Sequence, residues 1–160
     1  MKFYSLTFLL AFVAFTSAVA QEYKIITTVE SIVPMGIGRS RMVDPQSSAD
    51  YKELTTERTD GKSSSQGDIK REDIKIDNFQ ETKLLNFYSA VGINFQNITS
   101  NDAVVSSKLT ELTNEGWSLM FVTSGVESDA GVKDGNGIFI TRYIFKRDEP
   151  TAKAISNNGQ

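Results

Sequence analysis

The fold is decided by residues 102–126, which read DAVVSSKLTELTNEGWSLMFVTSGV. Apolar side chains recur at helical spacing in the first half, and Ser100 or Asn101 is suited to cap the N-terminus of a helix. We therefore expect a helix over Asp102–Glu115, ended by Gly116 in a left-handed turn. The residues that form its apolar stripe are Val104, Val105, Leu109 and Leu112.

Two strands follow the helix, over Trp117–Val126 and Ile138–Arg147, and a polar loop joins them. This pattern predicts a β-hairpin. Both strands carry large apolar side chains on both faces, which is typical of strands that are covered on two sides. One helix covers only one face of a small sheet. The other face is therefore covered either by the apolar segment Leu84–Phe95 or by another molecule.

The chain before the helix contains one strand and a long polar stretch. Residues Tyr23–Val33 alternate, which predicts a half-buried strand. Its apolar face carries Tyr23, Ile25, Thr27, Val29 and Val33, and its polar face carries Lys24, Thr28 and Glu30. Charged and small polar residues dominate at about 44–77, so we expect a long exposed insertion there, with a short strand around Tyr51–Thr56. Order resumes near Phe79.

Together these elements predict a single α+β domain over residues 21–148. It consists of a small antiparallel sheet of three to four strands, packed by one main helix and interrupted by the polar insertion. A composition of 39% hydrophobic and 23% charged residues in 160 fits one such globular domain.

The N-terminus has the pattern of a secretory signal peptide. Lys2 provides a basic start, Leu6–Phe15 is an almost uninterrupted apolar run, and small residues precede a cleavage site after Ala20. The run is shorter than the roughly 20 residues needed to cross a bilayer, which disfavours a membrane anchor. We expect an exported protein, periplasmic or extracellular, with signal peptide 1–20, no membrane span in the mature chain and a disordered tail at 149–160.

The absence of cysteine and histidine excludes several classes of function. Cysteine nucleophiles, histidine bases, disulfides and zinc sites built from these ligands are ruled out. A net charge of -3 argues against a nucleic-acid partner, because phosphate binding requires a concentrated basic surface.

We do not expect an enzyme, and we expect no cofactor. No serine lies in a G-x-S-x-G motif, and no carboxylate lies in an apolar context that would raise its pKa. A carboxylate-based hydrolase is the remaining enzymatic alternative. Its candidate residues alternate with basic residues, which is typical of a solvated segment. They are Asp68, Glu72, Asp73 and Asp77.

The segment Gly36–Arg41 is the strongest candidate ligand site. Gly36 and Gly38 allow a ligand to approach the backbone closely, and Arg39 and Arg41 can pair with a phosphate, sulfate or carboxylate. However, the segment does not lead into a helix N-terminus, as phosphate-binding loops do. A strand-end turn with solvated arginines is therefore the competing interpretation.

The loop between the last two strands contains oxygen ligands of the kind that calcium prefers, at Asp129, Asp134 and Asn136. It lacks the spacing of an EF-hand, since Gly137 follows directly and no glutamate comes at the required distance. We therefore expect a hairpin loop and no metal site.

Three motifs resemble a family of small bacterial domains of unknown function. They are Glu22-Tyr23-Lys24, Leu109-x-x-Leu112-x-x-x-Gly116-Trp117-x-Leu119 and Tyr143-Ile144-Phe145-Lys146-Arg147. The resemblance covers Glu22–Val33 and about Ala103–Asp148, leaves Pro34–Asp102 unmatched, and has Ser118 in place of the usual acidic residue. It implies a compact strand-helix-strand-strand unit and carries no activity. The whole chain also resembles hypothetical exported proteins of the Bacteroidetes type.

The motif around Gly116 also has a physical reason of its own. Gly116 ends the helix in a left-handed turn, Trp117 begins the strand, and Leu109, Leu112 and Leu119 meet beneath the turn. We expect these five residues to be structural.

The apolar hairpin and the lack of an acid–base set favour a non-catalytic binding module. We expect it to bind a second copy of itself or another envelope protein, through an apolar sheet face or an exposed strand edge. The alternative is a small-molecule or anion-binding protein that uses the Gly36–Arg41 turn.

Overall fold

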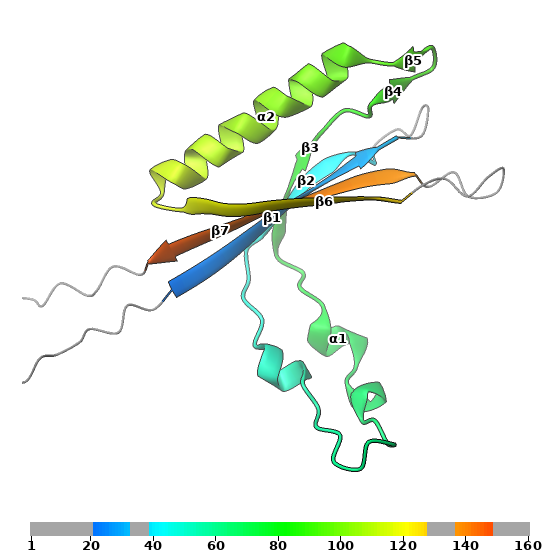
Figure 1. The fold of residues 1–160 in the computed structure, drawn as a ribbon, viewed down its shortest axis with the longest axis vertical. Helices are drawn as coiled ribbons and strands as arrows, with labels where there is room; N and C mark the ends of the chain where they lie inside the picture. The colour runs from blue at the N-terminus through cyan, green and yellow to red at the C-terminus, as the bar shows by residue number, and fades with distance from the viewer. Residues whose placement is uncertain (1–20, 33–38, 128–136, 149–160) are drawn as a thin grey trace, which may run out of the picture.

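The computed structural model describes residues 21–32, 39–127 and 137–148, and its main part is a five-stranded antiparallel sheet beneath a long helix (Figure 1). The strand order is β3-β2-β1-β7-β6, and a short ribbon, β4-β5, precedes helix α2. The α+β class is confirmed, but the sheet has five strands and not three or four. The elements are β1 (Gln21–Ser31), β2 (Arg41–Pro45), β3 (Phe79–Lys83), β4 (Tyr88–Ser89), β5 (Gly92–Ile93), α2 (Phe95–Asn114), β6 (Ser118–Glu127) and β7 (Ile138–Asp148).

Strand β1 is central, and it pairs with β7 over its whole length. Its alternation is present, but its orientation is the reverse of the predicted one. Ile26 and Thr28 are buried beneath α2, whereas Tyr23 and Ile25 lie on the opposite face and are exposed. The face that reads as polar in the sequence is therefore the one that α2 covers.

The hydrophobic core lies between the sheet and α2. Leu112 of α2 is buried there, and Val104 and Leu109 pack beside it. Full burial of a large apolar side chain contributes about 1.5–3 kcal/mol, so a domain without disulfides depends on this cluster. Its buried apolar members are Ile26, Met42, Leu84, Leu112, Trp117 and Phe145.

Helix α2 begins earlier than predicted, at Phe95. The side chain of Asn94 caps it by accepting a 3.1 Å hydrogen bond from a backbone N–H of the first turn. The predicted caps, Ser100 and Asn101, lie inside the helix. Asn101 is buried, and its amide bonds both backbone groups of Leu85, at 2.8 and 2.7 Å. The role of Asn101 is therefore to bind the backbone at Leu85, and not to cap the helix.

The turn predicted after α2 is present. Gly116 has a φ of 89°, and the Trp117 N–H donates to the Leu112 carbonyl at 3.0 Å. The Arg147 guanidinium lies 4.3 Å from the centroid of the Trp117 ring, a cation–π contact. Leu119 is 46% exposed, because it lies on an edge strand. It is therefore not part of the buried core, contrary to the expectation that three leucines meet beneath the turn.

Residues 46–78, which we call the arm, connect β2 to β3 and extend away from the sheet on the side opposite α2 (Figure 1). None of them is buried. The strand predicted at Tyr51–Thr56 is wrong, because the Asp50 side chain accepts from the Lys52 N–H and caps a helical turn instead. The arm contains three single-turn helices, η1 (Tyr51–Leu54), η2 (Gln66–Asp68) and α1 (Arg71–Ile74).

The apolar segment 84–95 packs on the same side of the sheet as α2. Leu84 belongs to the core, and the Phe87 N–H donates to the Ser31 carbonyl at 3.1 Å. The Phe87 ring also lies against Phe139, with ring centroids 6.5 Å apart. The segment is therefore not the cover predicted for the second face of the sheet.

Candidate functional site

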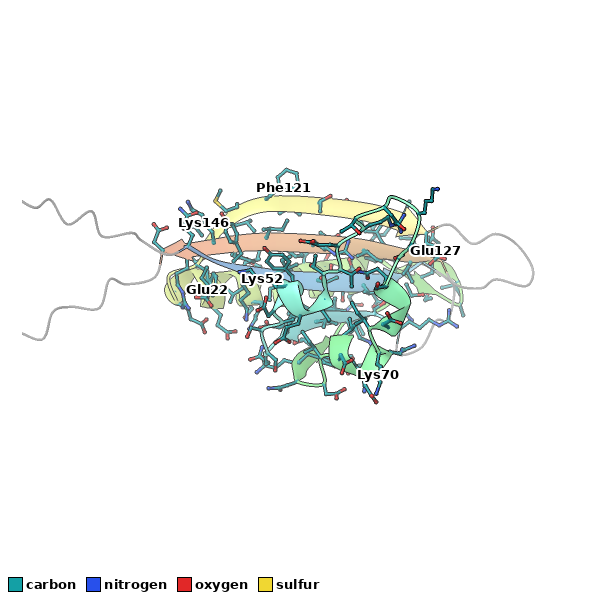
Figure 2. The ribbon with its side chains drawn as sticks, turned by 90° about the horizontal axis from the view of Figure 1, so that it is seen from below. Glu22, Lys52, Lys70, Phe121, Glu127 and Lys146 are labelled. Atoms are coloured by element: carbon teal, nitrogen blue, oxygen red, sulfur yellow. The ribbon has the colours of Figure 1, made fainter. Side chains whose placement is uncertain are left out.

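The face of the sheet opposite α2, which we call the open face, carries a large apolar side chain on each of its five strands. Residues in register share a face, so the pairing of the strands assigns each side chain to one side. Tyr23 and Phe121 are each 62% exposed, and Ile25 and Phe79 are each 44% exposed. Figure 2 shows the sheet from this side, with the arm in front of part of it. The large apolar residues of the open face are Tyr23, Ile25, Val29, Val43, Phe79, Phe121, Ile138, Ile140 and Ile144.

Charged side chains border these apolar residues, and one of them, Arg142, lies in their midst; positive charge predominates. The register places Arg41, Lys83, Arg142 and Lys146 on the open face, together with Glu81 and Glu127. An exposed apolar surface rimmed by polar groups is typical of an interaction site. A partner with an apolar surface and a carboxylate-rich border fits it best, because complementary charges steer association and fix its register.

The base of the arm borders one end of the open face. A depression of about 300 Å³ lies there beside β1. It is lined by Tyr23 and Ile25 of the open face, by Glu22 and Lys24 of the α2 side, by Ser47 and Ser48 of the arm and by Trp117, among others. This volume is at the lower end of the range for ligand pockets. Its mixture of aromatic, aliphatic, hydroxyl and charged groups suits a polar or aromatic side chain of a partner protein.

The two edges of the sheet differ. Strand β6 forms one edge, and all ten of its residues are exposed. Its register with β7 shifts between Leu119 and Phe121, which makes Met120 a β-bulge. Strand β3 forms the other edge with five residues, among them Glu81 and Lys83.

The candidate anion site is only partly described, because Gly36 and Gly38 lie outside the described residues. Arg39 and Arg41 line a shallow depression of about 560 Å³ together with Val29, Glu127 and Ile138. The Arg41 guanidinium forms an ion pair with Glu81 at 2.5 Å. Carboxylates therefore occupy or border the positions that an anionic ligand would need, and an anion site here stays a prediction.

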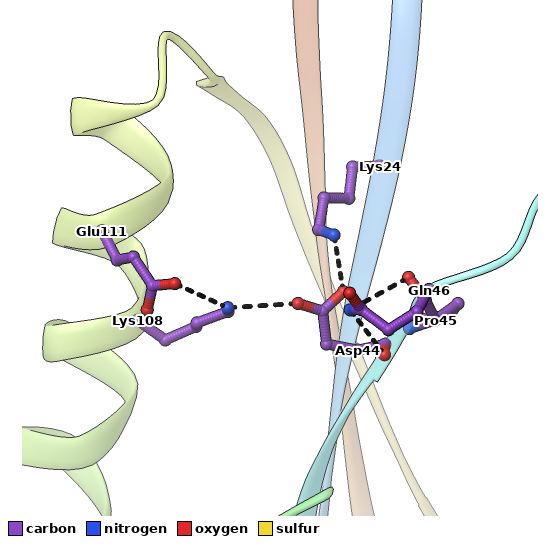
Figure 3. A network of polar contacts seen from close by, with 6 residues as sticks. All are labelled: Lys24, Asp44, Pro45, Gln46, Lys108 and Glu111. Atoms are coloured by element: carbon purple, nitrogen blue, oxygen red, sulfur yellow. Dashed lines mark hydrogen bonds and ion pairs between the residues drawn. The ribbon is translucent and has the colours of Figure 1, made fainter. Parts of the chain in front are cut away.

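A network of polar contacts joins α2 to the sheet, as Figure 3 shows. The Asp44 carboxylate of β2 lies 2.7 Å from the Lys24 ammonium and 3.1 Å from that of Lys108. Lys108 also contacts Glu111 at 3.3 Å. Burial alone lowers the pKa of Lys108, but the hydrogen bonds to Asp44 and Glu111 outweigh it and the pKa is raised. The Gln46 amide donates to the Asp44 carbonyl at 3.2 Å.

This network explains why β2 was missed in the sequence. Asp44 lies at the start of the predicted polar insertion, yet it is only 4% exposed. A carboxylate is tolerated in such a place only with charged partners, and here they come from β1 and α2. The network holds α2 on its face of the sheet, and its charged groups lie on the side away from the open face.

A half-buried carboxylate, Glu30, contradicts the expectation that no carboxylate has a raised pKa. Burial raises the pKa of Glu30, and the charge of Asp102 raises it further. The hydrogen bond that Glu30 accepts from Asn101 at 2.7 Å lowers the pKa, but it does not outweigh them. The pKa of Tyr143 is raised too, mainly by burial. Since Asn101 also holds Leu85, we interpret this cluster as a structural contact between β1 and α2.

The four candidate carboxylates of a hydrolase all belong to the arm and are exposed. Two of them lie within ion-pair distance of neighbouring lysines, Glu72 with Lys70 at 3.6 Å and Asp77 with Lys75 at 2.5 Å. Such contacts are typical of a solvated segment and contribute little to stability.

No family model, curated protein or solved structure matches the chain. The family resemblance seen in the motifs therefore stays a prediction. The signal peptide, the loop with Asp129, Asp134 and Asn136, and the C-terminal tail lie outside the described residues. Among the helices of the described ranges, none has the length and apolar character needed to cross a membrane.

Proposed function

We propose that this protein is a non-catalytic, exported module of the bacterial envelope that binds another protein through the open face of its sheet. One observation carries the proposal. Tyr23, Ile25, Phe79 and Phe121 are exposed together on that face, while α2 and segment 84–95 both pack on the other. The sequence pattern of residues 1–20 supports export.

The size of the open face suits a protein partner. Five strands spaced about 4.8 Å apart, over about six residues of 3.3 Å each, span roughly 500 Å² in projection. A specific protein–protein interface buries about 800 Å² on each partner. The open face alone therefore offers more than half of that area.

Two carboxylates, the buried Asp44 and the half-buried Glu30, support a non-catalytic role. Asp44 lies between two lysines, and Glu30 accepts a bond from Asn101. Both groups thus have partners within the fold, and both lie on the α2 side of the sheet. Neither is directed to the open face.

The proposal is tested by photo-crosslinking in the native host. A photoreactive residue at Ile25 reports contacts of the open face, and one at the exposed Thr110 of α2 is the control for the opposite side. We expect one discrete protein adduct from position 25 and none of the same mass from position 110. Equal adducts from both positions, or none from position 25, would overturn the proposal.

A further inference from the structure

Apart from the β-bulge at Met120, strand β6 lacks the features by which proteins keep sheet edges from pairing. It has ten residues, no proline and a single charged residue, Glu127, at its very end. The opposite edge, β3, is half as long and carries Glu81 and Lys83. Short length and charge protect an edge strand, so β3 is protected and β6 is open to pairing. The exposed apolar residues of β6 are Leu119, Met120, Phe121, Val122 and Val126.

We propose that β6 pairs with β6 of a second copy of this chain, antiparallel, about a two-fold axis at Thr123. A two-fold axis perpendicular to the sheet makes the edges antiparallel and keeps corresponding faces on the same side. Residues that lie opposite each other then come from the same face. With the axis at Thr123, Val122 lies opposite Ser124 of the partner subunit, and Phe121 lies opposite Gly125 of the partner subunit.

This register makes β6 complementary to itself at its centre. Phe121 lies on the open face of this edge strand, and its side chain is 62% exposed. Gly125 lies on the same face, and a Cβ added there would meet nothing within 4 Å. An aromatic side chain opposite a glycine fills such a gap and stabilises the pair of strands. By symmetry the contact forms twice.

The β-bulge extends the match to the ends of the strand. Because Met120 is an extra residue, Ser118 and Glu127 share the open face, opposite Lys146 and Ile138 of β7. Ser118 then lies opposite Glu127 of the partner subunit, with Lys146 next in the same row. Strands lie about 4.8 Å apart, so the Lys146 ammonium and that carboxylate can meet above the small serine. Each copy supplies both charges, which makes a second copy the fitting occupant.

This pairing goes beyond the proposed function and does not depend on it, because it uses the edge of the sheet and not the open face. It joins the two sheets into one. Both copies of α2 lie on one side, and both open faces form a continuous surface on the other. A dimer would thus present twice the binding surface of a single chain.

The chain contains no cysteine, so a disulfide tests the register directly. In Thr123→Cys the two thiols lie at the two-fold axis, where opposite Cα atoms are about 4.5–5.5 Å apart, within disulfide range. Thr82→Cys, exposed on the protected edge β3, is the matched control. On mild oxidation of the purified protein we expect the Thr123→Cys dimer to form at least about tenfold faster. Equal rates would overturn the proposal.

Sedimentation provides a second measurement that needs no new bond. The purified protein is expected to be a concentration-dependent dimer. Thr123→Lys, which juxtaposes two ammonium groups, should weaken it at least about tenfold, and Thr82→Lys should not. A wild-type protein that stays monomeric at all concentrations would contradict the pairing. If Thr123→Lys is unfolded by circular dichroism, the disulfide result decides. The Ile25 crosslink reports separately on the open face.

Discussion

The substitution Asp44→Asn tests the network that holds α2 on the sheet. It keeps the shape of the side chain and removes the charge that Lys24 and Lys108 share. Removing one partner of a buried ion pair costs about 3–5 kcal/mol. The two lysine side chains are 22% and 14% exposed and can turn partly to water, which discounts that cost. We therefore expect a loss of about 3 kcal/mol in the free energy of unfolding, or about 10 °C in Tm for a domain of this size.

The assay is urea unfolding followed by the fluorescence of Trp117, the single tryptophan, which is buried. The matched control is Asp77→Asn, which removes a carboxylate with 76% of its side chain exposed and in contact with Lys75. Its effect should stay within about 0.5 kcal/mol, because surface ion pairs contribute little. The reasoning fails if Asp44→Asn changes stability no more than this control does.

Three further predictions concern the turn at Gly116, the half-buried Glu30 carboxyl and the arginines. Gly116→Ala should cost about 1–2 kcal/mol in urea unfolding, because a φ of 89° strains any residue with a Cβ; an unchanged midpoint would contradict this. Burial raises the pKa of Glu30 in the folded protein above its ordinary value of 4.5, so folding takes up a proton there. The wild type therefore loses stability as the pH rises from about 4.5 through the raised pKa. Glu30→Gln should therefore gain stability relative to wild type between pH 4 and pH 7, and no gain would refute the assignment. Since Arg41 is held by Glu81, calorimetric titration with inorganic phosphate should give the same heat for the wild type and for the Arg39→Ala, Arg41→Ala variant; a saturable heat lost in the variant would restore the anion site.

The parts of the fold that follow from local sequence were predictable. The apolar stripe of α2, the glycine at its end and the two apolar strands after it depend on neighbours in the chain. Gly116 and Trp117 take the predicted roles because a left-handed turn and a hydrogen bond to Leu112 are local features. The start of α2 was not predictable, because several residues in this region are suited to cap a helix. Asn101 bonds Leu85 from inside the helix, and Asn94 is the residue that caps it.

The candidate site depends on contacts between distant segments, which the sequence does not display. Strand β2 carries a buried aspartate that is stable only because Lys24 and Lys108 meet it, and so it reads as part of a polar loop. The ion pair of Lys24 with Asp44 lies on the face of β1 whose sequence is polar, and this is the face that α2 covers. Tyr23 and Ile25, on the other face, are therefore exposed. The alternation itself was a usable signal, but it did not tell which face α2 covers.

The central claim is that the open face is bare in the isolated chain and covered by a protein in the cell. Hydroxyl-radical footprinting of Tyr23 tests it most directly, with Tyr51 of the arm, 71% exposed, as the internal reference. We predict that Tyr23 is labelled as readily as Tyr51 in the dilute purified protein, and several-fold less in the native envelope. Labelling of Tyr23 that is weak in the purified protein, or equal in both preparations, would contradict the claim.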